Sequence, residues 1–168
     1  MTDPEPTAPV PVTLKRTTLI VRDAEASARW YERVLGLSRW FDRPFTLSGV
    51  GLAAGKAGDV TRLVILRGED PVLGMIGLLQ WVDPPLDAPA EVPTEVRFGM
   101  PIFVASTADA QGVYARALAA GTRVHAAPHE WSTPGADGVE KRFLGVSVFD
   151  PDGYFFEVNE LLPPAEGQ

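Results

Sequence analysis

A short stretch near the C-terminal end of the chain brings together residues that could bind a ligand or move a proton. Residues 150–153 read Asp-Pro-Asp-Gly, which is typical of a tight turn, because proline presets φ and glycine accepts a positive φ. The residues that follow alternate as in a strand, so Glu157 shares one face with Phe155 and Asn159. There the carboxylate could act as a base or hold a cation. The simpler interpretation is a solvated glutamate on an edge strand, because carboxylates are seldom buried without a partner.

Other residue types that could do chemistry are scarce. The chain has no cysteine, which excludes disulfides, thiolate nucleophiles and thiolate metal sites. The two histidines are His125 and His129. We expect His129 on an exposed loop, residues 128–135, where an acid–base role stays open. The glycines at 49, 51 and 55 lack the strand–loop–helix context of a phosphate-binding loop, and no Ser–His–Asp arrangement is supported.

Composition limits the partners. Among 168 residues, 22 acidic and 15 basic side chains give a net charge of −7, which argues against nucleic acid or an anionic membrane as a partner. The hydrophobic content of 45% suffices for one domain or two small modules sharing a core. No apolar run approaches the ~18 residues of a membrane span, and the N-terminus lacks the order of a signal peptide. We therefore expect a soluble, cytoplasmic protein.

The first half of the chain predicts one helix among strands. Residues 14–22 alternate as a strand, Asp23 is a good N-cap, and Gly36 stands where a helix ends. Helix 24–35 has an apolar stripe, and the following strands are separated by Gly, Pro and Asp. The stripe consists of Ser27, Trp30, Tyr31 and Val34, and the strands are residues 39–41, 46–53, 61–67 and 73–81.

The second half repeats this order. A strand at 100–106 precedes a helix at 109–121, whose stripe is Ala110, Val113, Tyr114, Ala117 and Leu118, and strands at 122–126, 139–149 and 154–161 follow. The repeat predicts two βαβββ modules. The expected divisions are a disordered tail at 1–13, a module at 14–82, a proline-rich linker at 83–97, a module at 98–161 and a tail at 162–168.

Each predicted unit has one helix and a sheet with an uncovered face, which must find a partner. We therefore predict an α+β fold, in which two tandem modules form a curved mixed sheet around a central cavity, with the helices outside. Such concave interfaces favour ligands.

The two modules together resemble a known family. Residues 16–23 and 27–36 resemble the opening of glyoxalase, bleomycin-resistance and extradiol-dioxygenase proteins, the vicinal oxygen chelate superfamily. Residues 114–121, 128–129, 149–153 and Glu157 resemble that family's second module. The resemblance covers nearly the whole chain apart from its tails and linker. It specifies the fold better than the reaction, because the family includes lyases, isomerases, dioxygenases, thiol transferases and metal-free drug binders.

The resemblance also implies where metal ligands would lie. Metal enzymes of the family take ligands from an early position of each module's first strand and from each module's last strand. Glu157 matches, and Gln80 offers an oxygen in the last strand of the first module. Arg16 stands where those enzymes carry His, Gln or Glu. Ile102, or a neighbour such as Met100 or Phe103, cannot ligate. We therefore expect no metal site, since oxygen-rich sites need several ligands in fixed geometry.

Three functions follow as hypotheses. The first is a binding protein for a small hydrophobic or aromatic molecule, built on a degenerate metal site. The second is a glyoxalase-like lyase or isomerase with Glu157 as catalytic base or as metal ligand. The third is a dimerisation module without a ligand. The aromatic residues available to a ligand are Trp40, Phe41, Phe45, Trp81, Trp131, Tyr154 and Phe155, although each could equally serve the core or an interface.

The predicted ligand site follows from strand alternation and the resemblance. Its residues are Arg16, Thr18, Gln80, Trp81, Trp131, Phe155, Glu157 and Asn159. Leu19, Val21, Phe156 and Val158 should face the helices. The resemblance places Arg16 and Glu157 at one shared site, so we expect an ion pair between them in place of a metal. We also expect a homodimer, because modules of this family commonly pair further.

Overall fold

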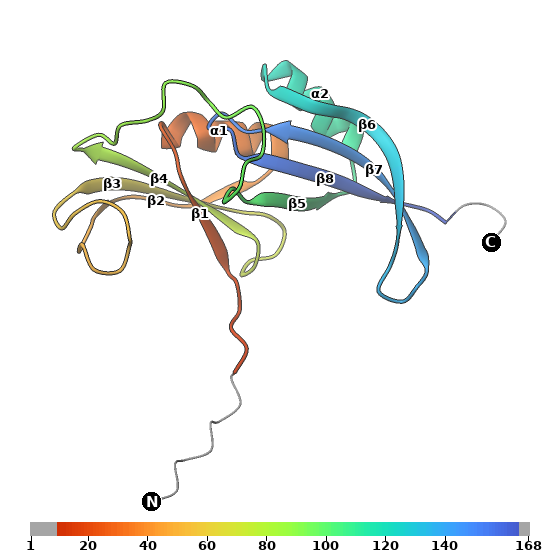
Figure 1. Ribbon diagram of the computed structural model, residues 1–168, viewed down its shortest axis with the longest axis horizontal. Coiled ribbons are helices and arrows are strands. Elements are labelled where there is room, and N and C mark those ends of the chain that lie inside the picture. Colours follow the sequence, from red (N-terminus) through yellow and green to blue (C-terminus); the bar gives the residue numbers. More distant parts are fainter. Residues whose placement is uncertain (1–9, 165–168) are drawn as a thin grey trace, which may run out of the picture.

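The computed structural model describes residues 10–164 and contains two modules of the same βαβββ order (Figure 1). The first comprises β1 (Arg16–Ile20), α1 (Ala24–Leu35), β2 (Ser38–Thr46), β3 (Val60–Arg67) and β4 (Met75–Asp83). The second comprises β5 (Ile102–Thr107), α2 (Ala110–Ala119), β6 (Arg123–Pro134), β7 (Glu140–Phe149) and β8 (Phe155–Leu162). The predicted tails fall largely outside the described residues. Among the helices described, none has the length and apolar character needed to span a membrane.

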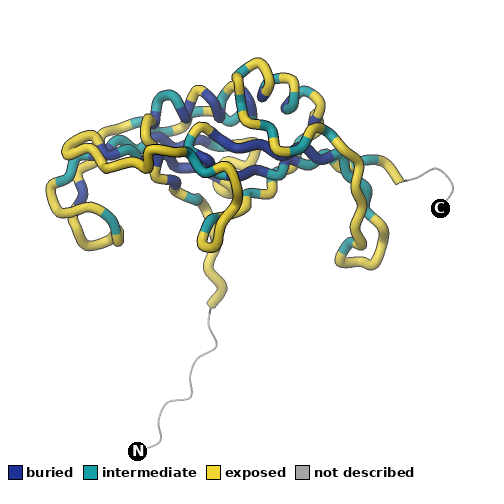
Figure 2. The backbone as a smooth tube through the Cα atoms, turned by 45° about the horizontal axis from the view of Figure 1, so that its top comes forward, coloured by how far each residue is buried: buried dark blue, intermediate teal, exposed yellow. Residues whose placement is uncertain are grey.

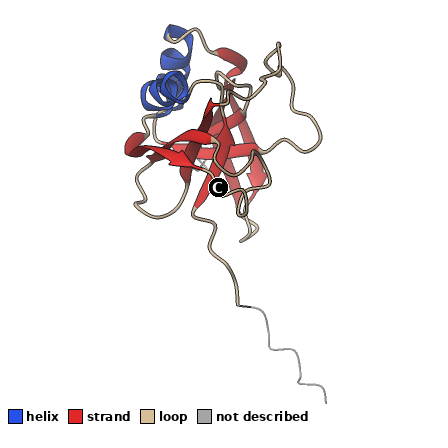
Figure 3. Ribbon diagram, turned by 90° about the vertical axis from the view of Figure 1, so that its left-hand side faces the viewer, coloured by secondary structure: helices blue, strands red, loops and turns tan. Residues whose placement is uncertain are grey.

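Each module forms its own four-stranded sheet. The strand orders are β1-β4-β3-β2 and β5-β8-β7-β6, and in each sheet the first strand runs parallel to the last while the other pairs are antiparallel. Both helices cover the same side of the two sheets (Figures 1 and 3). We call the opposite side the open face. The predicted α+β fold with tandem modules is confirmed, but the sheets of one chain stay open and do not curl around an enclosed cavity.

The first helix forms as its sequence predicts. Asp23 accepts hydrogen bonds from the backbone N–H groups of Glu25 and Ala26, and Gly36 ends the helix at φ 70°. The predicted apolar stripe is buried throughout. An N-cap of this kind stabilises a helix by about 1 kcal/mol, and the stripe holds the helix on the sheet.

The second helix departs from its prediction at one position. Asp109 caps it by accepting from the N–H of Gly112, and Val113 and Ala117 are buried. Leu118 was predicted to pack against the core, but its side chain is 54% exposed. It lies at the edge of the apolar stripe, and the small Ala117 takes the position closest to the sheet.

Two strands run through prolines where the sequence predicted breaks. β2 continues through Pro44, and the strand predicted at 46–53 is instead part of an irregular loop. β6 continues through Pro128, where a loop was predicted. Both are edge strands, and an edge strand tolerates a residue without an N–H group. A register shift in β6 between Ala126 and His129 also accommodates Pro128.

One hydrophobic core joins the two modules. It lies between the helices and both sheets, and Figure 2 shows buried segments in the helices and in the strands beneath them. Its large residues from the two halves meet directly: the ring centroids of Tyr31 and Phe156 lie 5.6 Å apart. The modules therefore hold each other in place through side-chain packing.

A buried turn reinforces this contact. Tyr31 donates its hydroxyl hydrogen to Asp150 over 2.7 Å, and Asp150 also accepts from the N–H groups of Asp152 and Tyr154. Burial raises the pKa of Asp150 to about 6, although these hydrogen bonds oppose the change. Asp152 in turn accepts from the Ser27 hydroxyl over 2.8 Å. The Asp-Pro-Asp-Gly turn of the second module thus docks on the helix of the first.

Candidate functional site

The face of β8 opposite the helices carries side chains that could bind a ligand or transfer a proton. Phe156 and Val158 belong to the core beneath the helices, so alternation directs Phe155, Glu157 and Asn159 to the open face. The sequence predicts the same alternation, but Phe155 is buried, at 7% exposure, and does not line the pocket beside Glu157 and Asn159.

A pocket of about 210 Å³ lies beside these residues on the open face of the second module. Strands β6, β7 and β8 build it from neighbouring positions, and we call it the module 2 pocket. Its lining residues are His129, Trp131, Gly145, Val146, Ser147, Glu157 and Asn159.

The indole of Trp131 is held in place on one wall of the module 2 pocket. Its Nε1 donates a hydrogen bond to Asn159 Oδ1 over 3.1 Å, and its ring stacks on Phe143 with centroids 4.7 Å apart. Gly145 makes room for the indole, since a Cβ there would lie 2.8 Å from Trp131 Nε1. A fixed aromatic surface of this kind suits a flat apolar ligand.

The polar groups of the module 2 pocket complement that surface. Glu157 contributes a carboxylate and Ser147 a hydroxyl. The Nδ1 of His129 lies 3.0 Å from the carbonyl oxygen of Ala127, so it donates there and the neutral ring keeps Nε2 as an acceptor. The pocket thus offers three acceptors that could orient a ligand's N–H or O–H groups, and two of them, the carboxylate and the imidazole, could also take up a proton.

Arg16 lies elsewhere. Its Nε donates to Thr18 Oγ1 over 3.1 Å on the open face of β1, and its stem crosses Gly77, where a Cβ would lie 3.2 Å from Arg16 Cδ. It lines a crevice of about 260 Å³ between β1 and β5. No ion pair links it to Glu157 within residues 10–164. The predicted pair is therefore wrong within one chain, because the two residues belong to separate, open sheets.

Gln80 was predicted to line the ligand cavity beside Glu157, but its side chain lies on the helix side and lines a cavity beside the linker, not the module 2 pocket. Its Oε1 accepts from the N–H of Ala24 over 2.9 Å, at the start of α1 on the helix side. Glu160 makes the same contact with Ala110 at the start of α2, also over 2.9 Å. The shared role makes Gln80 and Glu160 equivalent, and the equivalent of Glu157 in the first module is then Gly77.

Trp81 does lie on the open face of the first module, but it is not free to contact a ligand there. Its side chain is 5% exposed and packs with Leu47 and Leu79. Its Nε1 donates to Asp59 over 3.1 Å. The β2–β3 loop therefore fills the surface that the second module leaves open.

The four places where the family's metal enzymes carry ligands hold a poor set of donors. Arg16 and Ile102 each stand seven residues before a capping aspartate, at the start of β1 and β5. Gly77 and Glu157 occupy the last strands. One carboxylate is the whole donor set, and residues 10–164 contain no group of three His, Asp or Glu that could hold a metal ion. These residues do not fit a divalent cation.

His129, Ser147 and Gly145 line the pocket but were not predicted as pocket residues from the sequence. An isolated glycine in an apolar strand signals a close approach by another group, and this signal was present at Gly145. His129 and Trp131 would have been assigned to one face by period-two alternation if residues 128–134 had been recognised as a strand.

Comparisons with solved structures agree with this architecture. A glyoxalase family protein from Bacillus cereus is similar with a TM-score of 0.76 at 12% identity, over 94% of this chain and 99% of that one. TnmS3, an antibiotic binding protein from a Streptomyces species, gives 0.56 at 17% identity, over 92% and 100%. The trypanothione-dependent glyoxalase I of Leishmania major gives 0.58 at 16% identity, over 89% and 87%. At these identities the likeness shows the fold alone.

The sequence comparisons identify the family. A search of curated proteins gave no match. The family model described as Glyoxalase/Bleomycin resistance protein/Dioxygenase superfamily matches residues 13–158, which covers both modules and the linker between them. The chain belongs to this superfamily.

Proposed function

We propose that the protein binds a small, flat hydrophobic or aromatic molecule on the open face of the second module, without a metal ion. The observation that carries the proposal is Trp131, held by Asn159 and Phe143 beside the carboxylate of Glu157. The indole provides apolar contact area, and Glu157 and Ser147 orient the polar groups of the ligand. The antibiotic-binding role of TnmS3 supports this class of ligand, and so does the donor set, which lacks the oxygens that a cation needs.

We propose further that two copies associate through their open faces. The module 2 pocket, at about 210 Å³, is smaller than the ~300 Å³ at which sites for drug-sized ligands begin. Apolar side chains are exposed beside it on the same face: Val104 is 71% exposed and Ile102 53%. A second copy would cover these residues, deepen the pocket and bring its own Arg16 towards Glu157.

Calorimetric titration with a panel of planar aromatic molecules tests the binding proposal. We expect binding to persist in excess chelator. Replacing Glu157 with Gln should weaken it by roughly tenfold to a hundredfold, because a hydrogen bond to a charged group contributes roughly 1.5–3 kcal/mol. Gly145→Ala should weaken it as well, because the new methyl group displaces Trp131. A ligand that requires a divalent ion, or that binds both variants like the wild type, overturns the proposal.

A second candidate is proton transfer on an enolisable substrate, as in a lyase or isomerase. It is favoured by the placement of Glu157 and His129 in one pocket, where one could remove a proton and the other return it. Solvent-deuterium exchange into a bound carbonyl compound would report this activity. Exchange that survives Glu157→Gln would exclude Glu157 as the base.

A further inference from the structure

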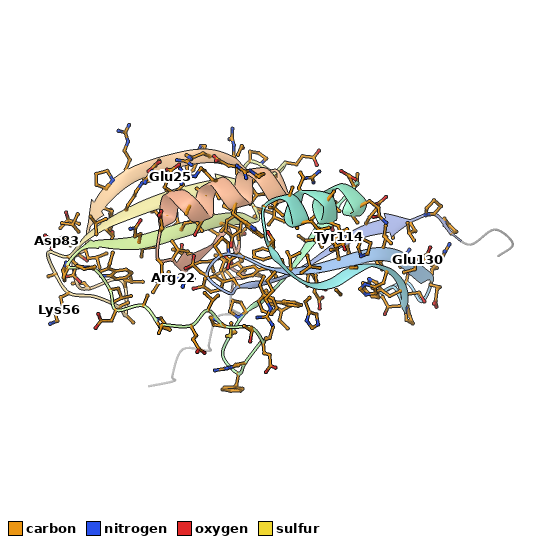
Figure 4. The ribbon with its side chains drawn as sticks, turned by 90° about the horizontal axis from the view of Figure 1, so that it is seen from above. Arg22, Glu25, Lys56, Asp83, Tyr114 and Glu130 are labelled. Carbon is orange, nitrogen blue, oxygen red and sulfur yellow. The ribbon has the colours of Figure 1, made fainter. Side chains whose placement is uncertain are left out.

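Another cavity, larger than the module 2 pocket, lies beside the linker. It measures about 670 Å³ and is bordered by the linker, the ends of β1 and β4 and the turn before β8. We call it the linker cavity. Figure 4 shows the linker running from Asp83 along one side of the molecule, past Arg22, while Glu130 of β6 lies at the opposite end. The linker cavity and the module 2 pocket share no lining residue.

The walls of the linker cavity are mostly apolar. Ile20, Trp81 and Val82 come from the strand ends, and Met100 from the end of the linker. The roof is supplied by linker residues, namely Pro85, Leu86, Ala88, Pro89, Val92 and Pro93. This lining and size suit the apolar body of a small molecule.

The roof contacts the second module at one end, and the walls are joined by a hydrogen bond between the modules. Pro93 packs on the turn of the second module, where a Cβ at Gly153 would lie 2.8 Å from Pro93 Cδ. Tyr154, which also lines the cavity, donates its hydroxyl hydrogen to the carbonyl oxygen of Ile20 over 3.0 Å. The cavity is therefore part of the fixed contact between the modules.

The charges around the linker cavity are unbalanced. Arg22 is paired with Asp152 over 2.9 Å and also donates to the carbonyl oxygen of Pro151, so these two charges offset each other. Asp87 and Glu91 also line the cavity, and the ion pairs found within residues 10–164 include neither of them. Two carboxylates thus remain at the rim of an apolar space.

We infer that the linker cavity binds an apolar amine: a hydrophobic body beneath the linker with a protonated nitrogen beside Asp87 and Glu91. The apolar walls select the body, and the two carboxylates favour a cation over a neutral or anionic group. An apolar anion would meet unpaired negative charge at the rim, so the site discriminates by charge as well as by shape.

The test uses two fluorescent probes that share one apolar ring system. Dansylcadaverine carries a primary ammonium group and dansylamide is neutral. When the dansyl group is excited directly, the emission of each probe shifts to shorter wavelength as the probe enters an apolar site. We expect the ammonium probe to bind the full chain about threefold to tenfold more tightly, in line with one or two solvent-exposed ion pairs. That advantage should shrink at 1 M salt, where charges are screened within ~3 Å. Equal binding of the two probes overturns the inference.

Variants then locate the site. Replacing Asp87 with Asn and Glu91 with Gln together should remove the advantage of the ammonium probe and leave dansylamide unchanged. A matched control, Glu69→Gln with Asp137→Asn, removes two exposed acids elsewhere and should preserve the advantage. Val82→Trp, at a half-exposed position of the wall, should weaken both probes by filling the space. If Glu157→Gln abolishes the advantage while the linker double variant keeps it, the probe occupies the open face and the inference fails.

Discussion

The open faces of the two modules have the same strand arrangement, but one is covered by a loop and the other is left exposed. In each module, a side chain from the last strand accepts from the N–H at the start of the helix: Gln80 for α1 and Glu160 for α2. Three residues earlier the same strands carry Gly77 and Glu157. In the first module the β2–β3 loop covers a small core around Trp81, whereas the second module leaves Trp131 partly exposed beside a pocket.

The difference shows how a duplicated fold can divide its tasks. Both modules need this hydrogen bond from the last strand to the start of the helix, because it orients the helix over the sheet whatever lies on the other face. The open face carries no such requirement, so one copy could fill it for stability while the other kept it available for a ligand. Stability and binding should therefore respond to substitutions in different halves of the chain.

The largest expected effect separates the two tryptophans. Trp81→Ala should lower the free energy of unfolding by about 3–5 kcal/mol, as for a buried aromatic residue, because it leaves a cavity and removes the hydrogen bond from the indole to Asp59. Trp131→Ala, at 37% exposure, should cost about 1 kcal/mol or less and abolish ligand binding. Urea denaturation of both variants measures the contrast. Similar losses would show that the two open faces are not specialised.

The next effect contrasts two Asp-Pro turns. Asp150 is buried and its pKa is raised to about 6. Asp70, in the matching turn of the first module, is exposed, and backbone hydrogen bonds lower its pKa. Because the native state holds its proton on Asp150 more tightly, the stabilisation is complete below about pH 4 and is lost as the pH rises through 6. We expect a loss of up to about 3 kcal/mol across this range.

Asp150→Asn should remove that slope, and Asp70→Asn should leave it in place. Unfolding free energies measured from pH 4 to pH 7 would report both. Tyr31→Phe should steepen the slope, since it removes a donor that lowers the pKa of Asp150 while keeping the ring in the core. A wild-type slope in the Asp150→Asn protein would assign the dependence to another group.

A smaller effect of opposite sign comes from the ion-pair network on the helix side of the first module. Arg39 and Arg62 hold Glu25 and lower its pKa to about 2. The native pKa lies below the model-peptide value of 4.5, so this contribution is present above about pH 4.5 and is lost as the pH falls towards 2. Glu25→Gln should cost about 1 kcal/mol at pH 7 after screening and clearly less at pH 2, as measured by thermal unfolding. An equal cost at both values would mean that packing, not charge, is lost.

The smallest expected effect concerns Gly77 and Gly145, which leave room for neighbouring side chains on the open faces. Gly77→Ala places a methyl group 2.8 Å from Thr18 Oγ1 and 3.2 Å from Arg16. Both are side chains that can move, so we expect a change of about 1 kcal/mol or less and no effect on the module 2 pocket. Gly145→Ala should be equally mild for stability but weaken ligand binding. Loss of binding in the Gly77→Ala protein would tie the ligand to the first module.

The helices were predictable from local signals, while the strand boundaries were not. Asp23 and Gly36 are capping residues whose effect is local, and the helix between them appears where they predict it. Pro44 and Pro128 indicate breaks in isolation, but each lies in an edge strand, and that position depends on which strands pair. Strand order is a property of the whole sheet and cannot be derived from one stretch of sequence.

The candidate site was likewise predictable where local signals determine it, and not where the pairing of strands does. Alternation after a recognisable turn placed Phe155, Glu157 and Asn159 on one face. The predicted face of Gln80 was not correct because it depends on the register of β4. A shift of one residue moves every side chain of a strand to the other face. The pairing of Arg16 with Glu157 failed for a different reason, because it assumed a closed arrangement of the modules.

The prolines of the outermost strands also bear on how the molecule behaves when it is concentrated. A row of unpaired N–H and C=O groups along a sheet edge can recruit a strand from another molecule, and that reaction leads to fibrils. β2 and β6 form these outer edges and carry Pro44 and Pro128, which interrupt the row of donors. Growth of the sheets by strand addition is thereby discouraged at these two edges. The prolines that hide these strands from sequence-based prediction therefore also oppose aggregation.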